Sequence, residues 1–133
     1  MSTALDHLLA APPAKQIAAL RAGLPAREAA DFALQNGLAV GDLAPVLGLG
    51  PATLTRRSRA GGQLDQTASE RLLRLARIAR HATQAFGDAA RASAWLTSPH
   101  RLLGESPLSL LDTAHGGHEV ERQLLAIEHG LPI

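Results

Sequence analysis

The longest stretch of this chain without glycine or proline runs from residue 63 to residue 86, and its apolar side chains follow helical spacing. Thr67 and Glu70 form a T-x-x-E capping box near its start. Behind that cap the apolar positions are Leu72, Leu73, Leu75, Ala76, Ile78 and Ala79. The sequence Phe86-Gly87-Asp88 interrupts the pattern. Together these features predict a long amphipathic helix over residues 67–86.

Shorter helices are expected elsewhere, because glycine and proline recur along the rest of the chain. Residues 14–25 and 26–37 each show a helical pattern that ends near glycine, and residues 88–96 form another short helix. Residues 1–13 are weakly patterned and stopped by proline, so a frayed start is expected.

Residues 102–117, LLGESPLSLLDTAHGG, place several chain breaks around one short apolar segment. Ser106 is a candidate cap and Pro107 a candidate first residue of a short helix that Gly116 would end. A last helix is expected to begin near Glu119 and to end at Gly130.

The composition favours an all-α fold. Aromatic residues make up only 2% of the chain, so the core must be built from Leu, Ala, Ile and Val, and no segment alternates with the period of a strand. The absence of cysteine excludes disulfides and thiolate chemistry. No apolar run approaches the roughly 20 residues of a membrane span, and no signal-peptide pattern opens the chain. A cytoplasmic protein without membrane contact is expected.

Residues 38–58 have the pattern of a helix-turn-helix, with Gly50-Pro51 at the start of the second helix and Pro45 inside a short first helix. Thr53, Thr55, Arg56 and Arg57 are the candidate DNA contacts, and Arg59 is a candidate phosphate contact. Arginine suits this role because its planar fork pairs with guanine or phosphate. A helical hairpin with a solvated basic end remains the alternative.

Positive charge is concentrated in the middle of the chain. Residues 51–80 contain seven arginines and two acidic residues, whereas residues 81–133 contain three arginines and six acidic residues. Arg71, Arg74, Arg77 and Arg80 are spaced by three, so they drift around a helix of 3.6 residues per turn and are expected to flank its leucine face. The middle of the chain is therefore a candidate polyanion surface.

Catalytic and metal sites are not expected. His115, His118 and His129 lack a recognised ligand spacing, and the two glycines between the first two histidines are expected to place them on separate elements. No glycine-rich phosphate loop, G-x-S-x-G or H-E-x-x-H motif occurs. Neither an enzymatic activity nor a cofactor is therefore predicted.

From Thr53 onward the chain contains a spaced series of motifs: the TLTRR segment at residues 53–57, Phe86-Gly87-Asp88, Trp95-Leu96, Leu103-Gly104, Pro107, Leu110-Leu111-Asp112-Thr113, Gly117, Val120, Leu124, Ile127 and Gly130. In this series the chain resembles the Xre/ParS/MbcA-type antitoxins of bacterial type II toxin–antitoxin pairs. Three positions depart from the family pattern: His100 replaces asparagine, Glu105 replaces a second glycine, and Ala68 replaces an acidic residue.

The resemblance implies an all-α protein with an Xre-like helix-turn-helix region packed with a C-terminal helical toxin-binding domain, divided here at residues 1–66 and 67–133. It implies a homodimer that neutralises a RES-domain toxin, which consumes NAD, and that binds operator DNA to repress its own operon.

The expected toxin contacts lie at the end of the chain and in one loop. The tail Gly130-Leu131-Pro132-Ile133 and the preceding Glu128 and His129 are expected to cover the active-site cleft of the toxin, with Leu102 and Leu103 as further contacts. Packing of Leu131 and Ile133 on the protein's own core is the alternative for the tail. A transcription regulator without a toxin and a scaffold module are the alternative functions.

Overall fold

The computed structural model describes residues 3–130, and within that range it contains helices and no strand. This confirms the predicted all-α class. The helices of the N-terminal half are α1 (Ala4–Leu9), α2 (Pro13–Ala22), α3 (Ala26–Gln35), α4 (Val40–Leu47) and α5 (Pro51–Arg59). The remaining helices are α6 (Gln66–Phe86), α7 (Ala89–Thr97), the 3₁₀ helix η1 (Leu108–Asp112) and α8 (Ala114–Glu128).

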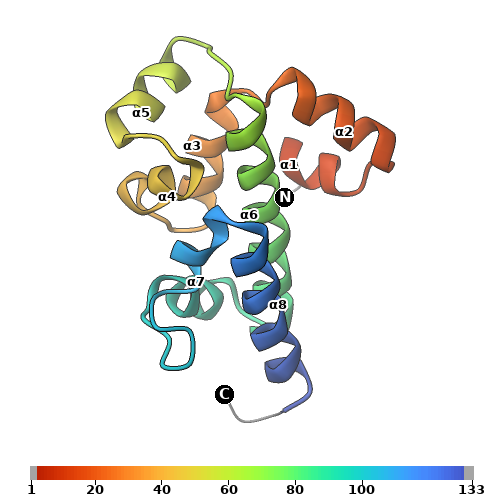
Figure 1. The fold of residues 1–133 in the computed structure, drawn as a ribbon, viewed down its shortest axis with the longest axis vertical. Coiled ribbons are helices and arrows are strands. Elements are labelled where there is room, and N and C mark those ends of the chain that lie inside the picture. Colours follow the sequence, from red (N-terminus) through yellow and green to blue (C-terminus); the bar gives the residue numbers. More distant parts are fainter. Residues whose placement is uncertain (1–2, 131–133) are drawn as a thin grey trace.

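Helix α6 is the axis of the molecule (Figure 1). From the N-terminal half, α1, α2 and α4 pack on α6, and α1 lies beside its residues 76–84. From the C-terminal half, α7, η1 and α8 pack on it. Leu72, Leu75 and Ile78 of α6 are fully buried, as the leucine face predicted. Since one helix supplies core residues to both halves, the two halves share a single hydrophobic core.

The start of α6 differs from the prediction. Asp65 is the N-cap residue, and its carboxylate accepts the backbone N–H of Ala68 at 2.7 Å. Thr67 is therefore already inside the helix and makes no cap. The predicted end at Phe86 is confirmed, because Gly87 follows in the left-handed conformation.

The expected frayed start is wrong, since α1 is an ordered helix. Thr3 and Asp6 form a capping box at its beginning, and Leu5 is 3% exposed. Six residues make a marginal helix in isolation, so burial of Leu5 against the core stabilises α1 where its local pattern does not.

The prediction for the segment after η1 is also wrong. Gly116 does not end a helix but lies in the first turn of α8, which is capped by Thr113 through the N–H of Gly116 at 2.9 Å. A Cβ atom at Gly116 would lie 1.9 Å from the carbonyl oxygen of Leu110. The glycine is therefore required for close packing of α8 on η1.

Helix α8 consequently includes both glycines that were expected to separate elements, so His115 and His118 lie on the same helix. Within residues 3–130, no three or more histidine, aspartate or glutamate side chains lie close enough together to hold a metal ion. They also contain no helix long and apolar enough to cross a membrane.

Candidate nucleic-acid and protein interfaces

Helices α4 and α5 form a helix-turn-helix at the end of the molecule where α6 begins (Figure 1). Helix α4 is short, as Pro45 predicted, and it ends at Gly48 in the left-handed conformation. Gly50 caps α5 and Pro51 is its first residue, as expected. Leu54 is fully buried and fixes which face of α5 turns outward.

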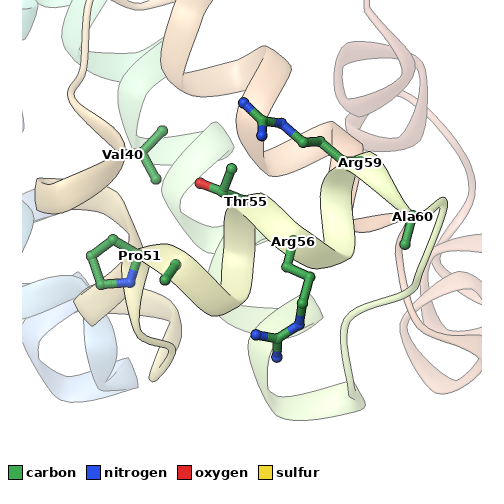
Figure 2. A pocket seen from close by; sticks show the side chains of 7 residues that line it. Val40, Pro51, Thr55, Arg56, Arg59 and Ala60 are labelled. Atoms are coloured by element: carbon green, nitrogen blue, oxygen red, sulfur yellow. The ribbon is translucent and has the colours of Figure 1, made fainter.

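The outward face of α5 forms a shallow concavity (Figure 2). Its lining residues are Val40, Pro51, Ala52, Thr55, Arg56, Arg59 and Ala60. Arg56 and Arg59 are exposed, and their guanidinium groups extend to two sides of α5, with Thr55 half-buried beside Val40. Small side chains between two arginines leave room for a ligand to approach the helix closely.

The five predicted DNA contacts therefore divide into two groups. Thr55, Arg56 and Arg59 line the concavity, whereas Thr53 and Arg57 are half-buried and do not. The carbonyl oxygen of Arg57 accepts the N–H of Gly62 at 2.8 Å, where the chain leaves α5. Rotation of 100° per residue from buried Leu54 accounts for this division.

Among residues 3–130, the arginines at the end of α5 have no ion-pair partner. Within residues 3–130, no carboxylate lies within 4.0 Å of the guanidinium groups of Arg56, Arg57 or Arg59. Unpaired arginines on an exposed helix are suited to phosphate, since no internal ion pair must be broken first.

Three of the four arginines of α6 instead contact other parts of the chain. Arg71 reaches the α4–α5 turn, where its Nη1 would lie 2.7 Å from a Cβ at Gly48. Arg74 Nη1 donates to the carbonyl oxygen of Leu111 at 3.0 Å, and Arg77 lies 3.6 Å from Glu121 of α8. Burial, together with the neighbouring Arg77, lowers the pKa of Arg74. Because arginines spaced by three point in different directions around α6, Arg71 reaches the α4–α5 turn, Arg74 reaches η1 and Arg77 reaches α8.

The loop of residues 98–107 is held by its own backbone. His100 donates its N–H to the carbonyl oxygen of Glu105 at 3.1 Å, and Gly104 donates to the carbonyl oxygen of His100 at 2.9 Å. This closed loop leaves Leu102 60% exposed, whereas Leu103 packs partly on the core. The two predicted partner contacts in the loop therefore differ, and only Leu102 is open to a partner.

The end of α8 contains a further exposed apolar side chain, Leu125, which is 50% exposed. Leu124 beside it is fully buried, so the pair shows that α8 carries leucine on two faces. Glu128 and His129 lie at the end of this helix, and Gly130 follows with φ +69°. The predicted contacts Leu131, Pro132 and Ile133 lie outside the described residues.

The two candidate surfaces are far apart along the molecule. Helix α5 lies beside the N-terminal end of α6, while the loop of residues 98–107 and the end of α8 lie toward the other end (Figure 1). The two surfaces therefore share no residue.

Comparison with known proteins identifies both halves. Residues 15–77 match the family model described as the antitoxin Xre-like helix-turn-helix domain. Residues 81–130 match the model described as the antitoxin Xre/MbcA/ParS C-terminal toxin-binding domain.

Three curated proteins named Antitoxin Xre are similar in sequence. The Photorhabdus laumondii protein is 32% identical over 116 residues, which cover 86% of this chain and 78% of that protein. The Pseudomonas putida protein is 38% identical over 79 residues, or 59% of this chain and 50% of that protein. The Yersinia enterocolitica protein is 37% identical over 86 residues, or 63% of this chain and 58% of that protein.

Proposed function

This chain belongs to the Xre/MbcA/ParS family of antitoxins, with a helix-turn-helix domain and a toxin-binding domain, and from that premise we propose its specific partners. It neutralises a RES-domain toxin that consumes NAD, and it binds operator DNA to repress its own operon. It acts by binding rather than by catalysis, as a homodimer in the bacterial cytoplasm, where both NAD and the operon are found.

The observation that carries this proposal is the placement of two surfaces of different character, one basic and one apolar, at opposite ends of the folded molecule (Figure 1). The α5 surface offers arginines without ion-pair partners among residues 3–130, and the other end offers exposed leucines. A polyanion is favoured by the first surface and a protein partner by the second. The division at residues 1–66 and 67–133 assigns one function to each part.

For DNA, Arg56 and Arg59 are the leading contacts because they line the concavity of α5. Thr55 is the candidate for a base contact, since it lies between them on the outward face. Thr53 and Arg57 take flanking positions, from which a phosphate is the accessible target.

For the toxin, the proposed surface combines Leu102, the end of α8 and the tail. Leu103 contributes by anchoring the loop to the core, and Leu125 is added because of its exposure. The residues from His129 to Ile133 cover the active-site cleft of the toxin and exclude its substrate, and Glu128 stands just before them as the last residue of α8.

Toxin neutralisation is tested by co-expression with the neighbouring reading frame, scored by growth and cellular NAD. The full chain should restore both, and deletion of residues 130–133 should abolish the rescue. Full protection by the truncated chain would contradict occlusion by the tail. DNA binding without any complex with the neighbouring product would instead indicate a regulator that has no toxin partner.

Operator binding is tested by replacing Arg56 and Arg57, or Arg56 and Arg59, with alanine. Each lost phosphate contact should reduce the slope of log affinity against log salt by about 0.9. The Arg56/Arg59 variant should lose more affinity, because both side chains line the concavity. Unchanged binding in a gel-shift titration over several salt concentrations would refute the assignment.

A further inference from the structure

His81 of α6 lies between two carboxylates of α8. Its Nε2 is 2.5 Å from Oε1 of Glu128, and its Nδ1 is 3.7 Å from Oε2 of Glu121. Arg77, one turn earlier on α6, lies 3.6 Å from the other oxygen of Glu121. The His81 side chain is only 19% exposed, so this contact is partly shielded from water.

Glu128 is the last residue of α8, and no other element holds that end by a side-chain hydrogen bond among residues 3–130. His129 caps the helix, and Gly130 at φ +69° turns the chain away. The final turn of a helix lacks internal partners for its carbonyl groups and frays readily unless it is fixed from outside. The contact with His81 is therefore a side-chain tether of the last turn, in addition to the packing of Ile127 on the core.

We infer that His81 is a positioning residue for toxin binding, which acts through Glu128 to fix the point and direction in which the tail leaves α8. This inference rests on the proposed function of the tail. It also reassigns Glu128, which the sequence placed among the direct toxin contacts, to a role within the antitoxin itself. The carboxylate of Glu128 is already bound by the imidazole before any partner arrives.

The physical consequence is preorganisation. When the tether is present, the last turn of α8 is ordered before the toxin binds; without it, the ordering must occur during binding. Ordering about one residue at that moment weakens affinity by about tenfold. The α5 surface lies near the other end of α6, so DNA binding should not change.

The experiment is a double-mutant cycle in the full chain with His81→Ala, Glu128→Ala and the double variant. Affinity for the purified product of the neighbouring reading frame is measured by calorimetry. Each single change should weaken binding by about tenfold, and the double variant should be no weaker than either, because both remove one tether. Independent losses that multiply would overturn the inference in favour of direct contacts.

Two further variants separate tethering from general destabilisation. His81→Gln keeps an N–H donor and should restore most of the affinity. Arg122→Ala removes the exposed 3.3 Å pair with Glu119 on the same helix and should have no effect. Equal losses in His81→Gln, His81→Ala and Arg122→Ala would contradict a specific tether.

A measurement without toxin keeps the inference distinct from the proposed function. Amide hydrogen exchange in the last turn of α8, residues 125–129, should accelerate in His81→Ala, whereas exchange in residues 116–120 should not. Unchanged exchange at both places would refute the tether even if the tail binds toxin. Failure of the unaltered chain to bind the neighbouring product, with the exchange effect present, would refute the proposed function instead.

Discussion

Replacing Gly116 with alanine tests how closely α8 fits against η1. The new Cβ would lie 1.9 Å from the carbonyl oxygen and 2.8 Å from the carbonyl carbon of Leu110. Non-bonded heavy atoms attract at about 3.5 Å or more, so the two backbones must separate by more than about 1 Å. That separation would open the packing of Leu111 and Val120, both fully buried.

The expected loss of stability follows from two opposing effects. Overpacking of a core costs about 1–3 kcal/mol, and the upper end applies because the obstacle is backbone rather than a mobile side chain. Alanine gains up to about 1 kcal/mol over glycine within a helix. The net expectation is a decrease in the free energy of unfolding of about 2 kcal/mol, measured by urea unfolding followed by circular dichroism.

Two other glycines provide matched controls. Gly41 lies inside α4 with no atom within 4 Å of its would-be Cβ, so Gly41→Ala should raise stability by up to about 1 kcal/mol. At Gly117 the nearest atom is Cδ of Arg74 at 3.0 Å, a flexible side chain, so Gly117→Ala should fall between the other two. If Gly116→Ala proved as stable as Gly41→Ala, the close approach of α8 and η1 would be refuted.

Three further changes address the cap, the core and the loop. Asp65→Ala should lower stability by about 1 kcal/mol and Thr67→Ala by less than about 0.5 kcal/mol in thermal unfolding, whereas the reverse order would place the cap at Thr67. Ser69 is fully buried and its hydroxyl accepts the N–H of Leu24 at 2.8 Å, so Ser69→Ala should cost about 1–3 kcal/mol in urea unfolding; no loss would contradict that bond. Leu102→Ser should leave the melting temperature unchanged and weaken toxin binding in a titration, and unchanged affinity would remove Leu102 from the interface.

The helices could be predicted where the signal is local. The leucine face of α6, its end at Gly87 and the start of α5 at Pro51 each depend on residues adjacent in sequence. The cap of α6 could not be chosen in this way, because both Asp65 and Thr67 are good cap residues. The choice follows from tertiary contacts: Leu64 donates to the carbonyl oxygen of Leu24 at 2.8 Å, which fixes the chain just before Asp65.

The candidate DNA surface was only partly predictable for a different reason. Residue type alone predicts that Thr53 and Arg57 contact DNA together with Arg56, although helical rotation from the apolar Leu54 separates them. The same argument separates Leu125 from Leu124 on α8. Both distinctions were available from the sequence. The contact of His81 with Glu128 was not, because it joins residues 47 apart on two helices whose register only the folded structure defines.

His100 departs from the family pattern, yet its side chain makes a turn bond of the kind typical of asparagine. Nδ1 of His100 accepts the N–H of Leu102 at 3.1 Å, which is the bond to a residue two positions later that an asparagine side chain makes in a turn. The ring of His100 also packs edge-on against the ring of Trp95, with centroids 5.8 Å apart. Asparagine has no ring and makes no such aromatic contact. Because the bond to Leu102 and the contact with Trp95 arise from one side chain, the loop gains an anchor to α7 while it still presents Leu102 to a partner.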